Sequence, residues 1–443
     1  AAGAGAGAPR GGHLAFAIPD HPWVDSAQGA AVRVAMTVGA AGAGDGRLLT
    51  VVEECTGDDG VVSVRLRERS GRINADLTVG ADVSAATVLA ANAGLSFMGC
   101  TPVGEGFLVS ADRARELAMA PGSSPHIRPY INGKDLADRP RGVYALDFFG
   151  LDADTVRDQF PSAYQHVLLT VKPERDQNKR DAYREKWWIF AEARAGMRKA
   201  LSGLSRYIAT CRTAKHRIFQ FLDVSCLPDS KVIAIASDDA GTLGVVSSRI
   251  HLCWAIATGS FLGIGNDSNY NNSECFGKFP FPDPTDPQRE RIRALAEQLD
   301  AHRKRQQAAH PGLTLTGLYN VLAALREGRA LTAKERTIHD QGLVGILRQL
   351  HDDLDAAVAD AYGWPADLPD DEVLTRLVAL NRTRADEEAQ GHIRWLRPDL
   401  APLGAPPLGA PAFPGAVLRG ASLPRPSRGP SACATGSLRC GPL

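Results

Sequence analysis

Short apolar runs alternate with turn-forming residues over the first hundred positions of the chain. HLAFAI (13–18) and AAVRVAMTV (30–38) are rich in apolar and β-branched residues, and the turn-rich PDHPWVDSAQG lies between them, so we predict two buried strands. LLTVVEE (48–54) and VVSVRLRE (61–68) flank TGDDG, which is the pattern of a β-hairpin. Taken alone, this region indicates a small β-rich domain.

The pattern becomes mixed between residues 99 and 282. Residues 182–200 carry Trp187, Phe190 and Arg194 at helical spacing and predict a helix, whereas 218–222 and 232–236 predict strands. Adjacent Trp187 and Trp188 would point about 100° apart on a helix, which favours burial at a domain junction over stacking on a base. FPFPDPTDP (279–287) ends the region, because four prolines in nine residues continue neither a helix nor a central strand.

Apolar residues then recur at helical spacing until about residue 400. Asp286 and Pro287 are predicted to open the first helix and Thr316 the second. The expected apolar stripes of four helices are Ile292, Leu295 and Leu299; Leu318, Val321, Leu322 and Leu325; Leu343, Ile346, Leu347, Leu350, Leu354 and Val358; and Leu374, Leu377 and Val378. After residue 400 the pattern ends, and 16 of the last 43 residues are Pro or Gly, so we predict a disordered tail over 401–443.

Length and composition set the class of protein. A chain of 443 residues is long enough for two to four globular domains, and its longest mostly apolar stretch, 251–265, falls short of the roughly 20 residues that span a bilayer. Eight scattered cysteines without a CxxC pair argue against a zinc site and a disulfide framework, and favour a reduced, cytoplasmic protein. The start AAGAGAGAPRGG resembles neither a signal peptide nor a natural start, so we expect a truncated beginning.

Charge is distributed unevenly along a chain whose formal net charge is zero. Residues 171–219 carry 13 Lys or Arg against 5 Asp or Glu, a net of +8, whereas residues 283–400 carry 16 against 20. A basic segment on an otherwise neutral to acidic protein is typical of contact with phosphates, so the charge pattern favours a nucleic-acid partner.

Several unusual phrases between Leu204 and Pro282 carry a family resemblance. They are LSRYIATCRTAKHRIFQF, VIAIASDD, GVVSSRIHLCWA and CFGKFPFP, preceded by HIRPYINGKDL (126–136) and VYALDFFGL (143–151). Together they resemble the target recognition domain of MmeI-like enzymes, which are single-chain restriction and modification proteins that methylate DNA adenine. The Asn-Pro-Pro-aromatic loop with which such enzymes hold a flipped adenine is absent from the 443 residues, as is a glycine-rich methyl-donor loop after an early strand.

The resemblance implies a multidomain α/β and α+β fold in four parts. Residues 1–98 would be the end of a Rossmann-like methyltransferase sheet, 99–282 a mixed α/β target recognition domain, 283–400 an α-helical domain and 401–443 the tail. In a complete protein it also implies S-adenosylmethionine as the donor and the exocyclic N6 of a flipped adenine as the acceptor. The donor pocket and the catalytic residues would lie outside this chain.

We predict that eight residues contact double-stranded DNA: Arg206, Arg212, Lys215, His216, Arg217, Asp238, Asp239 and Arg249. The four basic residues from Arg206 to Arg217 have no acidic neighbour before Asp223, and guanidinium and ammonium groups bind phosphates or guanine edges. The remaining basic residues of this segment have acidic neighbours within the same predicted helix and are expected to form a solvated face: Lys179, Arg180, Arg184 and Lys186, with Asp181 and Glu185.

The other predicted residues have weaker patterns. Asp238 and Asp239 are compatible with a turn or with acceptors for a cytosine amino group, and no Glu-x-Lys follows them as in a common nuclease. Segments 223–231 and 237–242 are therefore candidate base readers. Arg249 resembles a shared family position that supports the domain or holds a phosphate. His216 has no nucleophile or metal ligand spaced to work with it, which favours a hydrogen-bonding role over general-base catalysis.

Three hypotheses remain open from the sequence. The first is a fragment of a DNA adenine methyltransferase of a restriction-modification system, which the strand-like runs at 13–38 favour. The second is a free-standing specificity subunit that acts with a separate catalytic chain, and the third is a remnant without function. An upstream reading frame with an Asn-Pro-Pro-aromatic motif would favour the first, whereas a promoter and start codon would favour the second. The sequence does not indicate the oligomeric state or the bases recognised.

Overall fold

The computed structural model describes residues 12–23, 32–56, 62–74, 77–119, 122, 124–262 and 267–400. The predicted tail over 401–443, the chain's first eleven residues, and most of the TGDDG turn lie outside this range.

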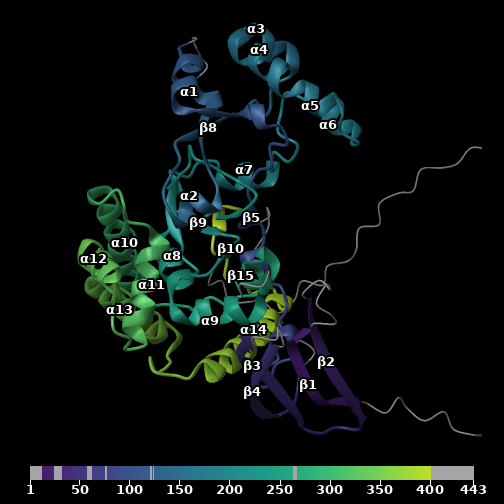
Figure 1. Ribbon diagram of the computed structural model, residues 1–443, viewed down its shortest axis with the longest axis vertical. Coiled ribbons are helices and arrows are strands. Elements are labelled where there is room, and N and C mark those ends of the chain that lie inside the picture. The colour runs from purple at the N-terminus through teal and green to yellow at the C-terminus, as the bar shows by residue number, and fades with distance from the viewer. Residues whose placement is uncertain are drawn as a thin grey trace, which may run out of the picture. The chain divides into compact units, whose positions relative to one another are not determined.

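Two hairpins form the first sheet, as the apolar runs predict (Figure 1). Its strands are β1 (Gly12–Trp23), β2 (Val32–Ala41), β3 (Gly46–Thr56) and β4 (Val62–Gly71), in the order β2-β1-β3-β4. β1 and β2 are antiparallel, as are β3 and β4, and a short parallel pairing joins β1 to β3.

The prediction that both early strands are buried is wrong for β2, in which Val38 is 55% exposed. β2 is an edge strand, and among the described residues this sheet's buried cluster consists of Ala17, Leu48 and Ile73. Its assignment to a methyltransferase domain stays a prediction.

An antiparallel sheet forms the centre of the region between residues 95 and 236. Its strands are β11 (Gln220–Asp223), β9 (Arg206–Cys211), β13 (Val232–Ile235) and β5 (Ser96–Met98), in that order. Side chains alternate between its two faces: Val232 and Ala234 belong to one buried cluster, whereas Ile233 and Ile235 belong to another. Both faces are covered, which explains why the run VIAIA is continuously apolar. The predicted strands at 218–222 and 232–236 are confirmed within two residues.

Two smaller sheets and several short helices complete this region. One sheet has the order β12-β7-β8-β6 and the other β10-β15-β14. The strands are β6 (Leu108–Ser110), β7 (Ile127–Ile131), β8 (Val143–Leu146), β10 (Thr213–Ala214), β12 (Leu227–Pro228), β14 (Ser260–Leu262) and β15 (Asp267–Asn269). The helices are α1 (Ala111–Ala118), α2 (Gly133–Ala137), α3 (Ala153–Gln159), α4 (Pro161–Thr170), α5 (Lys172–Asp176), α6 (Asp181–Glu185), α7 (Ala195–Leu201), α8 (Ala240–Ser247) and α9 (Arg249–Thr258).

The single helix predicted over 182–200 is wrong, because tertiary hydrogen bonds interrupt it. The chain leaves α6 after Glu185 and begins α7 at Ala195, and Arg194 between them has a left-handed φ of 58°. The buried Arg175 guanidinium donates to the carbonyls of Tyr183 and Ile189, which a continuous helix would use internally. The predicted burial is confirmed for Trp187, which is 8% exposed, and Trp188 donates its indole N–H to the Leu151 carbonyl; that they lie at a domain junction stays a prediction.

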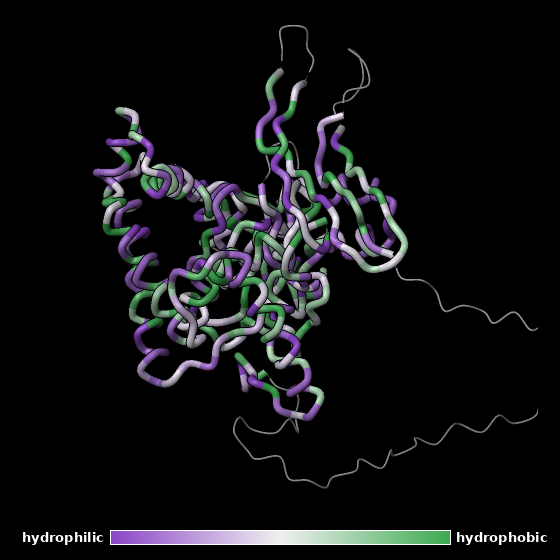
Figure 2. The backbone as a smooth tube through the Cα atoms, turned by 90° about the horizontal axis from the view of Figure 1, so that it is seen from below, coloured by the Kyte–Doolittle hydropathy of each residue, from purple (hydrophilic) through white to green (hydrophobic). Residues whose placement is uncertain are grey.

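The C-terminal region is helical, as predicted. It comprises α10 (Asp286–Ala309), α11 (Leu315–Arg326), α12 (Ala333–Gly342), α13 (Val344–Tyr362) and α14 (Asp370–Ala389), and polar and apolar residues alternate along the helices on the left of Figure 2. The helix starts differ slightly from prediction, since Thr285 caps α10 in a capping box with Gln288 and Thr314 caps α11. Ile346 departs from its predicted stripe and is 52% exposed. No described helix is long and apolar enough to cross a membrane.

Side chains of α14 hold the irregular segment that joins the first sheet to the central one. Asn381 is 1% exposed, and its amide group bonds both the N–H and the carbonyl of Thr87, as a neighbouring strand would. The Glu388 carboxylate accepts the N–H groups of Ala90 and Ala91 at 2.7 and 2.9 Å. Residues almost 300 positions apart are thereby fixed to one another, so the helical region holds the segment at residues 87–91.

Candidate nucleic-acid interface

The central sheet separates the basic residues that the sequence places in one cluster. Arg206 is the first residue of β9, and Arg212 directly follows its last residue. Six residues of strand span about 20 Å, so the two guanidinium groups start from opposite ends of the sheet. The basic residues of this run therefore do not all lie together, and the candidate interface has two parts.

Four exposed cations gather at the end of the sheet where β9 finishes, and we call them the basic edge: Lys134, Arg212, Lys215 and Lys231. The backbone N–H of Arg212 donates to the Lys231 carbonyl at 2.7 Å. Gly133, beside Lys134, packs against the backbone of Lys231 and accepts a hydrogen bond from the Cys211 thiol. Among the described residues, none of the four side chains forms an ion pair. Their charges are thus free to attract an anion.

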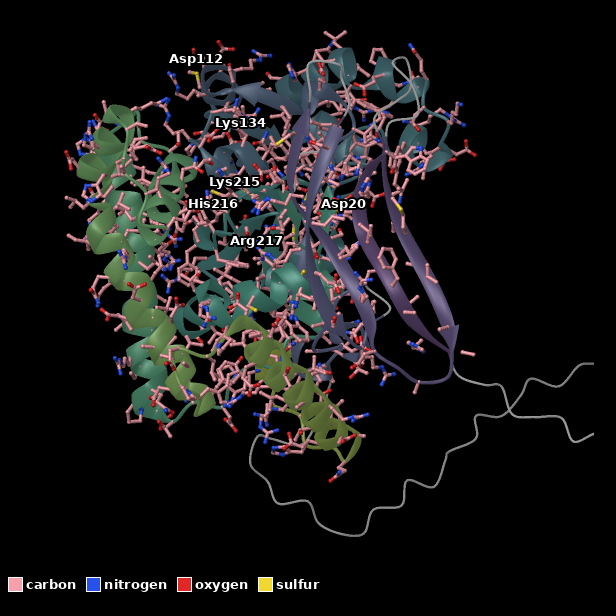
Figure 3. All side chains as sticks on the ribbon, turned by 60° about the horizontal axis from the view of Figure 1, so that its bottom comes forward. Asp20, Asp112, Lys134, Lys215, His216 and Arg217 are labelled. Carbon is pink, nitrogen blue, oxygen red and sulfur yellow. The ribbon has the colours of Figure 1, made fainter. Side chains whose placement is uncertain are left out.

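A residue of the helical region orients one of these cations. Asn320 of α11 uses its side-chain oxygen to accept hydrogen bonds from Lys215 Nζ at 3.0 Å and from His216 Nε2 at 2.8 Å. Burial lowers the pKa of His216, so this histidine is neutral at pH 7 and the bond places its proton on Nε2. Figure 3 shows Lys134, Lys215 and His216 in this part of the molecule. His216 therefore supports the basic edge through a hydrogen bond, as the sequence favours.

Arg217 has a structural environment. Its guanidinium donates to the carbonyls of Cys211 and Ser268 and to the Ser268 hydroxyl, and it lies 5.3 Å from the centre of the Tyr270 ring. Burial lowers the pKa of Arg217. Because Nη1 donates to Cys211 of β9 and Nη2 donates to Ser268 of β15, we assign Arg217 to holding β15 against the end of β9 rather than to phosphate contact.

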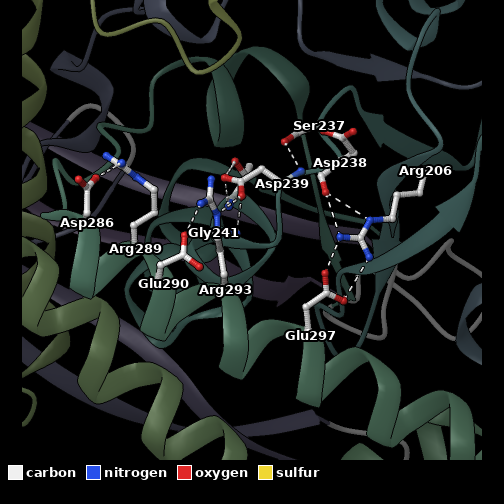
Figure 4. A network of polar contacts seen from close by, with 11 residues as sticks. Arg206, Ser237, Asp238, Asp239, Gly241, Asp286, Arg289, Glu290, Arg293 and Glu297 are labelled. Carbon is white, nitrogen blue, oxygen red and sulfur yellow. Dashed lines mark hydrogen bonds and ion pairs between the residues drawn. The ribbon is translucent and has the colours of Figure 1, made fainter.

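Arg206 and the two aspartates form the second part of the interface, at the other end of the sheet (Figure 4). Arg206 pairs with Glu297 of α10, lies 3.7 Å from the centre of the Phe221 ring and donates to the Asp238 carbonyl. The hydrogen bond that Arg206 donates to Glu297 raises the pKa of Arg206. Its charge is therefore already compensated, and a phosphate would have to compete with Glu297.

The two neighbouring aspartates have different environments. Asp239 caps the N-terminus of α8 through the N–H groups of Gly241 and Thr242, and it pairs with Arg293 at 2.7 Å. Asp238 is exposed, and no described hydrogen-bond donor contacts its carboxylate. Only Asp238 of the pair therefore presents a free acceptor, which is the group that would read a cytosine amino group.

Arg249 lies at the contact between α9 and the helical region. It donates to the Leu368 carbonyl and to Asp370, and its backbone N–H donates to Asp355. This arrangement fits the supporting role that the sequence allows for Arg249, and it leaves the phosphate role without a structural argument.

Sequence reasoning missed two members of the basic edge. Lys134 stands in INGKDL and Lys231 ends the candidate base-reading segment 223–231, so both lie in phrases that the resemblance had already singled out. Neither has a basic neighbour in sequence, and only folding brings them beside Arg212. No group of three or more His, Cys, Asp or Glu side chains that could hold a metal ion occurs in the part of the chain that the structure describes.

The fold has a counterpart among solved structures. The chain is similar to MmeI. The match is to a structure titled as the type IIL restriction-modification enzyme MmeI in complex with DNA, with a TM-score of 0.64 and 17% sequence identity. It covers 85% of this chain and 46% of the MmeI chain, so the present chain spans about half the length of that protein. No protein family matches the sequence, and no curated protein does. At this identity the likeness establishes a shared fold.

Proposed function

We propose that this chain is the DNA-reading part of a restriction-modification enzyme and that it binds double-stranded DNA through the basic edge. The observation that carries the proposal is the gathering, at one end of the central sheet, of four cations from separate segments that pair with no described carboxylate. Such a cluster neutralises phosphates and releases their counterions, which drives binding to duplex DNA of any sequence. The similarity of the fold to that of a protein solved with DNA supports the proposal.

Binding of the chain to a fluorescently labelled duplex at several salt concentrations tests this proposal. Four phosphate contacts predict a slope of log affinity against log salt of about −3 to −4. The absence of binding at low salt would contradict the proposal.

We further propose that the complete enzyme methylates adenine N6 with S-adenosylmethionine as donor. This rests on the family resemblance, which assigns the donor pocket and the flipped-base loop to segments that these 443 residues do not contain. Methylation-sensitive sequencing of cells that carry the full gene tests it, and an unmethylated genome would contradict it.

The chain itself is expected not to bind S-adenosylmethionine with useful affinity. The reason is that neither an Asn-Pro-Pro-aromatic motif nor a glycine-rich methyl-donor loop occurs in it. Calorimetric titration is the measurement. A dissociation constant in the low micromolar range would show that the fragment has been placed wrongly within the methyltransferase fold.

Asp238 is expected to read a base. Replacing it with alanine in the complete enzyme should cost roughly 1–3 kcal/mol on the cognate site and relax discrimination at one position, because a base contact is lost while the phosphate contacts remain. Competition binding against sites with single changed positions measures this. A uniform loss on all sequences would instead assign Asp238 a general electrostatic role.

A further inference from the structure

A cavity of about 370 Å³ lies at a junction of segments far apart in the sequence, and it is lined by Asp239 but by no residue of the basic edge. Its walls come from α14, the segment that α14 holds, the start of α8, the proline-rich turn at 281–284, α10, and the chain that follows α14. This volume is in the range of pockets that hold small organic ligands.

Apolar and polar side chains share the walls of this cavity. Leu89, Val245, Phe281, Ile292 and Leu396 contribute aliphatic and aromatic surface. Phe281 packs edge to face against Phe279 and Phe276, with ring centres 5.0 and 5.5 Å away, so this wall is held in place by other rings. A rigid apolar wall favours a ligand with a flat hydrophobic face.

The arginines of the cavity wall are compensated by carboxylates. Arg293 pairs with Asp239 and Glu290, and Arg289 pairs with Asp286, as Figure 4 shows. The other two arginines of the wall, Arg384 and Arg394, both pair with Glu387. No arginine of the wall is therefore free to attract a phosphate, and the cavity favours an uncharged ligand.

The Glu388 carboxylate and the Arg293 guanidinium each keep unused hydrogen-bonding positions. Each carboxylate oxygen of Glu388 accepts a single backbone N–H, and an ionised carboxylate has about four acceptor positions. Arg293 uses Nε and Nη1 in ion pairs, and no described residue accepts from its Nη2. The cavity therefore offers an acceptor to a ligand N–H and a donor to a ligand oxygen or ring nitrogen.

We propose that this cavity binds an uncharged, amino-substituted aromatic heterocycle, the chemistry of a cytosine or adenine base or its nucleoside. The ring stacks on the apolar side chains of the wall, and its amino group donates a hydrogen bond to the Glu388 carboxylate. A ring nitrogen or oxygen accepts a hydrogen bond from Arg293 Nη2. The site is independent of the basic edge and therefore of the proposed DNA binding.

Cytidine is the probe, and thermal unfolding together with calorimetry on the whole chain is the measurement. At about 100 times its dissociation constant, cytidine should raise the melting temperature by several degrees. Uridine lacks the amino donor and should bind about fivefold more weakly. Cytidine monophosphate should bind no better than cytidine, because the cavity has no free cation.

A pocket-filling variant locates the site. Ala91→Trp places an indole in the cavity and should abolish cytidine binding, whereas the matched control Ala379→Trp, on the exposed face of α14, should keep it. The comparison of cytidine, uridine and cytidine monophosphate uses the unaltered chain, so it stays valid if Ala91→Trp does not fold. Four results would each overturn the proposal. They are no binding at millimolar cytidine, equal affinity for uridine, higher affinity for the monophosphate, and unchanged cytidine binding by Ala91→Trp. None of these results depends on DNA, so they leave the proposed function untouched.

Discussion

Simultaneous replacement of Lys134, Arg212, Lys215 and Lys231 by alanine is expected to weaken duplex DNA binding roughly 10²- to 10³-fold at 0.15 M salt. Each neutralised phosphate adds about −0.9 to the slope of log affinity against log salt, so the quadruple variant should also lose most of that slope. Fluorescence anisotropy across a salt series measures both quantities. A single replacement of Arg212 should flatten the slope by about one unit and weaken binding on all sequences alike.

The matched control removes four positive charges elsewhere: Lys179, Arg180, Arg184 and Lys186, all replaced by alanine. These residues lie at or beside α6, where Arg184 pairs with Asp181 and Arg180 contacts the Tyr183 hydroxyl. The control should change affinity and salt slope only slightly. Equal losses in both variants would show that net charge, rather than the basic edge, determines binding, and unchanged binding in the first variant would remove the proposed interface.

Arg217→Ala is expected to lower the free energy of unfolding by about 2–4 kcal/mol, the second large effect. The substitution leaves the carbonyls of Cys211 and Ser268 without their donor and removes the packing of the guanidinium on Tyr270. Urea unfolding measures the change. The control is Arg212→Ala, which removes an exposed side chain and should cost under about 1 kcal/mol.

Arg212 and Arg217 lie five positions apart, and their alanine substitutions are expected to have different effects: one on DNA binding and the other on the free energy of unfolding. Arg217→Ala should reduce stability while the folded protein keeps its salt slope, and Arg212→Ala should do the reverse. If Arg217→Ala instead left stability unchanged and flattened the slope by about one unit, Arg217 would belong to the interface that the sequence predicted for it.

The outcome for these arginines shows where sequence reasoning succeeds and where it does not. A basic run without acidic neighbours in sequence suggested that all its members are free to bind phosphate. In the fold, Glu297 lies against Arg206 although 91 positions separate them, and Ser268 lies against Arg217 from 51 positions away. Partners at such distances leave no local signal, because they come from elements that the central sheet brings together.

The sequence by itself determined the element types wherever one periodicity dominated. The apolar run at 232–235 becomes a strand because both faces of its sheet are covered, and the stripes from Ile292 onward become helices because one face of each packs on the core. The proline-rich boundary before residue 286 is set by local chemistry, since proline lacks the N–H that helix interiors and central strands require.

Tertiary structure alone decided the rest. It interrupted the predicted helix at 182–200, because the buried Arg175 draws backbone carbonyls into its own hydrogen bonds. It also left β2 exposed and placed Lys134 and Lys231 beside Arg212 and Lys215. Asn381 of α14 forms hydrogen bonds with the backbone of Thr87. The physical reason is common to all four: hydrogen bonds and burial between distant segments are comparable in free energy to local propensities, so they override them wherever the two disagree.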